Sequence, residues 1–296
     1  PPPVPPTAPA IESITNTLGM KFKKLPAGTF MMGSPTDETD RAVNEHQHEV
    51  TISKAFYMQT TEVTQGQWKA VMGTEPWKGE DYIKEGANYP AVYVSWNDAV
   101  AYCKKLSVKE SKTYRLPTEA QWEYSCRAGT ETRWSFGNDE KALGDYAWYE
   151  KNAFNAGEKY AHQVGLKKPN AFGLYDMHGN VWEWCLDSVD DPRDPHILRG
   201  GSWCNAIDYA NCLARTYSFP PDKRIDYGGI RLLYLTEEMV NEYRKAYDDD
   251  GATVNADLSV VCFSGKQEDT TAAAAASEGQ SGLAAALDSA AKEAAK

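Results

Sequence analysis

Six cysteines are the residues of this chain with the widest range of chemistry. They lie at positions 103, 126, 185, 204, 212 and 262 of the 296-residue sequence. The sequence contains no Cys-x2-Cys pair, so the spacing fits no compact zinc cluster. Widely separated cysteines favour long-range disulfides in an oxidising compartment, and buried free thiols are the alternative. Cys204 and Cys212 closely follow the Gly-Gly-Ser-Trp segment at 200–203.

Other catalytic and metal-binding patterns are weaker. Gly-Gly-Ser-Trp (200–203) is not the Gly-x-Ser-x-Gly turn of a serine hydrolase, and no lysine follows its glycines as in a phosphate loop. His46 and His48 flank Gln47 and would share one face of a strand. We interpret them as the polar start of a strand, with a metal pair as the alternative.

The composition is that of a soluble globular protein, with 42% hydrophobic and 25% charged residues. A net charge of −11 repels phosphate groups, so neither nucleic acid nor an anionic membrane is an expected partner. No apolar stretch approaches the length of a membrane span, so we expect no membrane insertion. The 9 tryptophans and 17 tyrosines favour a loop-rich fold with aromatic packing.

The pattern of apolar residues predicts the elements that hold these side chains. Alternation predicts a strand, a turn and a strand over 22–34, and further strand structure over 50–64. From Gly129 to about 230 turn residues dominate, which indicates short strands and structured loops. Helices are predicted at 64–73, 94–110 and 116–129, with N-caps at Thr64, at Ser95 or Asn97, and at Thr118.

The two ends of the chain differ from its middle. Residues 1–13 form a Pro-rich tether, and the start at Pro1 indicates a processed chain with any signal or anchor upstream. Residues 236–296 are expected to contain a short helix over 236–247 and an Ala-rich tail. We interpret 266–296 as disordered, as a lone helix, or as an addition to the natural chain.

Four phrases of the sequence together resemble one family. They are PAGTFMMGS (26–34), RLPTEAQWEYSCRAG (115–129), NAFGLYDMHGNVWEWC (170–185), and RGGSW (199–203) followed by CLAR (212–215) and GGIRL (228–232). In this order they resemble the formylglycine-generating-enzyme superfamily, also called the sulfatase-modifying-factor domain. The resemblance covers residues 14–235. It implies an α+β, C-type-lectin-like fold with low regular secondary structure, two main helices and small antiparallel sheets. Such members share a fold but not one function, so activity depends on the residues of the site.

The cysteines of this sequence depart from the spacing of the family's copper site. Copper-dependent members oxidise a substrate cysteine to formylglycine through two thiolates spaced Cys-x4-Cys beyond the Gly-Gly-Ser motif. Here Cys204 lies one position early, and Cys212 is eight residues further on. The resemblance instead pairs Cys212 with Cys126 in a structural disulfide. Copper is therefore not expected, and a divergent formylglycine-generating-type oxidase that uses Cys204 is the alternative function.

The implied Cys126–Cys212 bridge would stabilise the fold. It closes a loop of about 85 residues, which is worth roughly 4 kcal/mol on the chain-entropy model. The second family bridge, from Cys103, is lost because Leu232 stands at the position of its partner. The iron-dependent branch of the superfamily needs a His-x3-His-x-Glu helix, and the sequence contains none.

Calcium is the cofactor that the resemblance implies. The phrase Gly-Asn-Val-Trp-Glu-Trp (179–184) matches a family calcium site built from hard oxygen ligands. The alternative for Glu183 is a buried ion pair with Arg199 or Arg127. The ligands would be Asn180, Val181 through its carbonyl and Glu183, with Asn152 at a second family site that lacks its aspartate here.

The segment 204–228 is the ligand-facing surface in this superfamily. Tyrosine, serine, aspartate and small residues on constrained loops make adaptable contacts, as in antibody paratopes. The candidate contact residues of this segment, given below, include no Lys, Glu, Gln, Met or Trp, as expected for a retroelement-varied display protein. A solvated loop without a ligand is the alternative. The candidate ligand-binding residues are Cys204, Ala206, Ile207, Asp208, Tyr209, Thr216, Tyr217, Ser218, Phe219, Ile225, Asp226 and Tyr227.

We therefore expect a non-catalytic, extracytoplasmic module that is secreted, periplasmic or tethered to a surface. It would bind a protein or glycan ligand through 204–228 and would be a monomer.

Overall fold

The computed structural model describes residues 11–36, 45–188 and 195–248. Most of the predicted tether, Cys262 and the predicted tail at 266–296 lie outside the described residues. No helix within the described ranges is both long and apolar enough to span a bilayer.

A five-stranded antiparallel sheet joins distant parts of the chain. One of its inner strands comes from the last part of the family-like region, so the sheet joins the beginning and the end of the domain. The order is β1 (Ser13–Thr15), β2 (Lys21–Leu25), β5 (Phe56–Gln59), β11 (Leu233–Leu235) and β6 (Thr113–Arg115).

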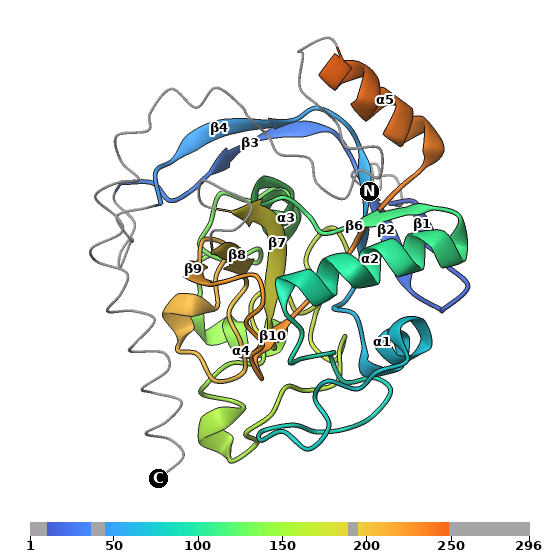
Figure 1. The fold of residues 1–296 in the computed structure, drawn as a ribbon. Helices are drawn as coiled ribbons and strands as arrows, with labels where there is room; N and C mark the ends of the chain where they lie inside the picture. Colours follow the sequence, from blue (N-terminus) through green and yellow to red (C-terminus); the bar gives the residue numbers. More distant parts are fainter. Residues whose placement is uncertain (1–10, 37–44, 189–194, 249–296) are drawn as a thin grey trace, which may run out of the picture.

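A second sheet carries the Gly-Gly-Ser-Trp turn. Its strands are ordered β10 (Gly228–Gly229), β7 (Trp182–Ser188), β8 (His196–Arg199) and β9 (Arg215–Phe219). The β10–β7 pair is parallel and the others are antiparallel. A two-stranded ribbon of β3 (Gly28–Met32) and β4 (His48–Ile52) arches over α3 (Glu119–Arg127), where Phe30 meets Tyr124 at 5.4 Å between ring centroids (Figure 1). His46 and His48 are exposed at the start of this ribbon.

The predicted helices are present, and the capping signals explain where they begin. In addition to α3 they are α1 (Gln65–Met72) and α2 (Trp96–Glu110). Thr64, Ser95 and Thr118 each accept a hydrogen bond from the third helical N–H, and the residue at that third position bonds back to the cap. Gly73 ends α1 in the left-handed conformation as expected, whereas Ala128 rather than Gly129 caps α3.

Between residue 129 and β11 the described residues form only short elements. This confirms the expected span of turns and structured loops. Besides the strands β7 to β10, these elements are η1 (Glu140–Ala142), α4 (Leu143–Tyr146), η2 (Phe154–Ala156) and η3 (Ile207–Tyr209).

Aromatic residues fill the core. Among the described residues, Trp68, Trp77, Trp122, Trp182, Trp184 and Trp203 have almost no exposed surface. Stacked pairs such as Trp68 and Tyr102, 5.1 Å apart, add geometric specificity to this burial. The core therefore holds long irregular loops in place without long helices.

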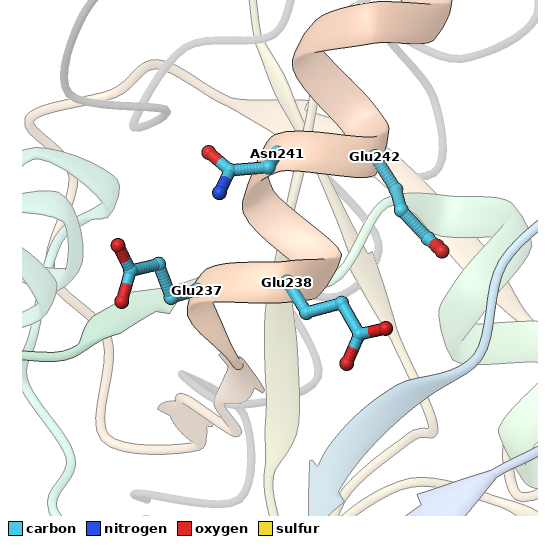
Figure 2. A pocket seen from close by; sticks show the side chains of 4 residues that line it. All are labelled: Glu237, Glu238, Asn241 and Glu242. Carbon is cyan, nitrogen blue, oxygen red and sulfur yellow. The ribbon is translucent and has the colours of Figure 1, made fainter.

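A last helix, α5 (Glu237–Asp248), follows β11 and lies at the end of the domain opposite η3 (Figure 1). The side chains of Glu237, Glu238, Asn241 and Glu242 line a shallow hollow along it (Figure 2). This hollow contains acidic side chains of a single helix, and we assign it no role.

Candidate functional site

The turn after β8 is built around two glycines in the left-handed region, with φ of 98° at Gly200 and 74° at Gly201. A Cβ at Gly201 would lie 2.2 Å from the carbonyl oxygen of Tyr209, and one at Gly200 would lie 2.9 Å from the Trp122 ring. The glycines therefore let η3 pack directly against the turn. This packing fixes the start of the predicted ligand-binding segment.

Cys204 follows this turn and is half-buried. Its Sγ lies 3.3 Å from the Ser202 hydroxyl. Burial raises the pKa of the Cys204 thiol to about 12, against the effect of the Ser202 hydrogen bond. The thiol is therefore protonated at neutral pH, and the thiolate that attacks or binds metal is suppressed.

Three aromatic rings from separate segments meet beside Cys204. The Trp203 ring lies 6.1 Å from the Tyr82 ring and 6.0 Å from the Phe154 ring. Tyr82 and Phe154 are half-buried, so each keeps part of its surface in solvent. Neither residue was predicted, because their segments are distant in sequence and only the fold brings them to Trp203.

Carboxylates also surround Cys204. The charges of Asp226 and Glu150 both act on its thiol. Burial, together with the charge of Asp81, raises the pKa of Asp226 to about 6. Tyr93, whose φ is 55°, donates its backbone N–H to the carbonyl oxygen of Ile225, 2.9 Å away, and so ties this second segment to the surface. We call Tyr82, Tyr93, Phe154, Cys204 and Asp226 the Cys204 surface.

The other predicted ligand-binding residues differ in accessibility. Asp208 is exposed and pairs with Arg133 at 2.7 Å. Thr216 and Ile225 are buried, with 4% and 6% exposure, so these two predictions are corrected. Thr216 is paired with Leu198 across β8 and β9, and Ile225 packs in the core beside Gly228. The half-buried predicted residues are Ala206, Ile207, Tyr209, Phe219, Asp226 and Tyr227. Tyr217 and Ser218 belong to β9, but the structure does not describe their side chains.

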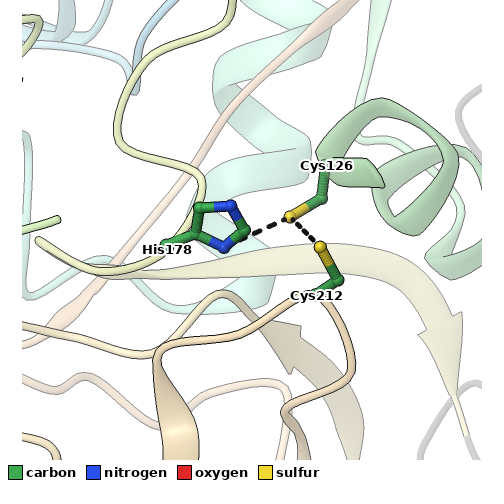
Figure 3. Close-up of side chains that lie close together, drawn as sticks. All are labelled: Cys126, His178 and Cys212. Carbon is green, nitrogen blue, oxygen red and sulfur yellow. Dashed lines mark hydrogen bonds between the residues drawn. The ribbon is translucent and has the colours of Figure 1, made fainter. Parts of the chain in front are cut away.

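Cys126 and Cys212 lie together in the core (Figure 3). Their sulfur atoms are 3.4 Å apart as free thiols, whereas a disulfide requires about 2.05 Å. The bridge remains a prediction. Cys212 is nevertheless occupied by this contact and does not supply a second thiol to Cys204. Cys103 and Cys185 are buried free thiols.

Glu183 is held by an arginine that the sequence did not indicate. Both its oxygens accept hydrogen bonds from the Arg231 guanidinium, at 2.7 to 3.0 Å, and the Trp122 indole N–H donates to Oε2 at 2.7 Å. Both charged side chains are at most 1% exposed. The expected partners Arg199 and Arg127 instead pair with Glu123. The expected ion pair is therefore present, but its partner is corrected.

The residues that the resemblance assigned to calcium have other roles here. The Asn180 carboxamide oxygen accepts from His162 N at 2.8 Å, and its NH2 group donates to Glu62 at 3.0 Å. Asn152 closes a local loop, accepting from Tyr149 N at 2.9 Å. With an arginine against both Glu183 oxygens, this set does not fit a calcium ion.

Glu62 and Asp176 are a buried carboxyl pair that was not predicted. As carboxylates, Glu62 Oε2 and Asp176 Oδ1 have no hydrogen-bond donor. Burial raises the pKa of both groups, and a hydrogen bond from Glu62 favours ionised Asp176. If Glu62 is protonated and donates to Asp176, both oxygens take part in a hydrogen bond. The signal was an acidic residue inside the apolar pattern of 55–63.

Comparison with known proteins identifies the family and the fold of this chain. Residues 11–235 match the family model of the sulfatase-modifying factor enzyme 1-like domain. The formylglycine-generating enzyme of Mus musculus is 28% identical, over 75% of this chain and 77% of that protein. PvdO from Pseudomonas aeruginosa superposes with a TM-score of 0.69 at 28% identity, over 77% of this chain and 99% of that one. Treponema denticola variable protein 1 superposes with a TM-score of 0.64 at 29% identity, with the same coverage. The chain therefore belongs to the family of sulfatase-modifying factor enzyme 1-like domains and has its C-type-lectin-like fold.

Proposed function

We propose that this chain is a non-catalytic module that binds a protein or glycan ligand through the Cys204 surface and the adjoining exposed part of η3. The observation that carries this proposal is the separation of the two cysteines after Gly-Gly-Ser-Trp. Cys212 lies against Cys126, so Cys204 has one thiol where a copper oxygenase needs two.

The chemistry of the Cys204 surface suits binding. Half-buried tyrosine and phenylalanine rings offer large contact areas at a low cost in side-chain entropy. Carboxylates at Asp226 and Asp81 add polar contacts around them. A structural relative named a variable protein supports the idea that this fold can present a changeable surface. A reverse-transcriptase gene beside a template copy of the codons for 199–232 would support retroelement variation of this surface.

Arrays of glycans and of tiled peptides from surface proteins provide the probes for the test. Phe154→Ala and Asp226→Lys should each weaken every specific interaction at least ~10-fold, because buried aromatic and charged anchors dominate binding energy. Val108→Ser is the matched control, since Val108 is 82% exposed on α2. Equal binding by wild type and both surface variants would contradict the proposal.

The alternative is a divergent oxidase that uses Cys204. It is favoured by similarity to a formylglycine-generating enzyme and by the place of Cys204 beside an aromatic surface. The thiol's raised pKa opposes it. Aldehyde formation on a cysteine peptide, in the presence of Cu(I) and oxygen, distinguishes the two functions.

We also infer that the module acts outside the cytoplasm. The support is the approach of Cys126 and Cys212, which need only a small movement to form a bridge. Labelling of an engineered exposed cysteine at Val108 by an impermeant reagent on intact cells tests this location. Labelling only after the cytoplasmic membrane is broken would contradict it.

A further inference from the structure

Cys126, His178 and Cys212 bring three soft ligand atoms together inside the core (Figure 3). They come from α3, from the loop before β7 and from the segment after η3. Their ligand atoms all lie within 4.8 Å of one another, and all three residues are buried. This cluster is not part of the Cys204 surface that would contact the ligand, although the Cys126–Cys212 contact within it supports the proposed function.

Two of the three distances between the ligand atoms are close to those of ligands around one ion. Metal–sulfur bonds of about 2.3 Å and metal–nitrogen bonds of about 2.0–2.1 Å place tetrahedral ligand atoms roughly 3.5–3.8 Å apart. Here the two sulfurs are 3.4 Å apart, and Cys126 Sγ lies 3.7 Å from His178 Nδ1. We propose that, in the reduced protein, Cys126, Cys212 and His178 bind one thiophilic d10 cation, Cu(I) or Zn²⁺.

Metal binding would change the protonation of all three side chains. Ser135 donates its backbone N–H to His178 Nε2 at 3.2 Å, so the neutral imidazole carries its own proton on Nδ1. Binding releases both thiol protons to solvent and moves the imidazole proton from Nδ1 to Nε2. There the Nε2–H donates a hydrogen bond to the Ser135 hydroxyl oxygen, 2.8 Å away. One backbone hydrogen bond is lost, in exchange for two metal–thiolate bonds and one metal–imidazole bond.

The surroundings favour a soft cation over a hard one. Burial disfavours the Cys126 thiolate, and the positive charges of Arg199 and Arg127 act in the opposite direction. Thiolate and imidazole select Cu(I) and Zn²⁺ over Ca²⁺ and Mg²⁺. A disulfide between the same cysteines removes both thiolates, so metal binding and bridge formation exclude each other.

The test uses the full chain, reduced and free of metal. It is titrated anaerobically with Cu(I) against a chromophoric Cu(I) chelator, and separately with Zn²⁺ against a zinc indicator. One equivalent of at least one metal should bind, and Cys126→Ser or Cys212→Ser should each abolish that binding. His178→Asn should weaken it at least as much as loss of an outer-shell partner, about 10- to 100-fold. Cys204→Ser and Cys103→Ser are the matched controls and should retain the equivalent.

A measurement on the wild type keeps the test independent of how the variants fold. X-ray absorption at the bound metal should show two sulfur ligands and one nitrogen ligand. Binding of neither metal, coordination without sulfur, or an unchanged equivalent in both cysteine variants would overturn the proposal. Loss of the equivalent only in Cys204→Ser would overturn both this proposal and the proposed function.

Discussion

The substitution Glu183→Gln tests whether Glu183 is a structural ion-pair partner of Arg231. Glutamine has nearly the same shape, but its NH2 group would face guanidinium N–H groups that now donate to a carboxylate. The variant therefore leaves Arg231 charged and buried, with 0% of its side chain exposed.

The expected cost follows from the neighbours of the pair. Removing one partner of a buried ion pair costs about 3–5 kcal/mol. Glu62 and Asp176 also act on Arg231, and the charge of Glu183 raises the pKa of both. Without Glu183 they ionise more readily and replace part of the lost charge. We therefore expect the unfolding free energy to fall by an amount near the lower end of this range, about 3 kcal/mol. For a domain of this size that corresponds to a fall of about 6–12 °C in Tm.

The pH dependence of the unfolding free energy shows whether Glu62 and Asp176 replace part of the lost charge. Carboxyl groups with a raised folded-state pKa destabilise the fold as pH rises from their unfolded pKa, about 4, through their folded pKa. The upward pKa shifts of Glu62 and Asp176 should be smaller in Glu183→Gln, so the variant loses less stability than the wild type as pH rises. The difference in unfolding free energy between wild type and variant should shrink from pH 5 to pH 8.

Urea unfolding followed by tryptophan fluorescence measures this difference, with and without a calcium chelator. The double variant Glu183→Gln/Arg231→Met should lose less than the sum of the single losses, because the second substitution removes the unpaired charge. A loss below about 1 kcal/mol, against the 3–5 kcal/mol that a broken buried pair costs, would refute the structural role. An effect that appears only with calcium present would instead make Glu183 a calcium ligand.

Three further predictions concern packing, protonation and the bridge. Gly201→Ala should destabilise the fold by about 1–3 kcal/mol beyond Gly73→Ala, because both glycines have φ of 74° but only a Cβ at 201 meets another atom within 4 Å; equal melting temperatures would contradict this. Glu62→Gln should flatten the decline in stability between pH 5 and pH 8, since the glutamine NH2 group can donate permanently to Asp176; a decline as steep as in wild type would show that Glu62 is not the protonated partner. Mass spectrometry of protein isolated from its native compartment without reduction should find a Cys126–Cys212 peptide; only alkylated thiols at both positions would rule the bridge out there.

Local signals in the sequence predict the helices well. Thr64, Ser95 and Thr118 begin their helices as expected, because a capping box needs only four consecutive residues. The resemblance likewise predicted the fold class, since its phrases lie on the glycine turns and buried tryptophans that shape the domain.

The partners of buried charges could not be predicted in the same way. Glu183 and Arg199 are directly opposed in the β7–β8 register, yet Glu183 bonds to Arg231, 48 positions further along the chain. Side-chain direction decides between such candidates, and spacing does not reveal it. Tyr82 and Tyr93 were missed for a related reason, because tyrosine gives no signal of the positive φ that both adopt.

The accessibility of 204–228 was predictable only in part. Alternation suggests which residues of β9 share a face, but only the pairing of Thr216 with Leu198 shows which of them is buried. Ile225 is likewise covered by packing that involves residues distant in sequence.

The most direct test of the central claim is an oxidation assay on a cysteine peptide with Cu(I), oxygen and the reduced full chain. Wild type and Cys204→Ser should both leave the peptide thiol unchanged by mass spectrometry, because Cys204 has a protonated thiol and Cys212 is occupied by Cys126. Conversion to an aldehyde by wild type, lost in Cys204→Ser, would contradict the claim and establish the oxidase.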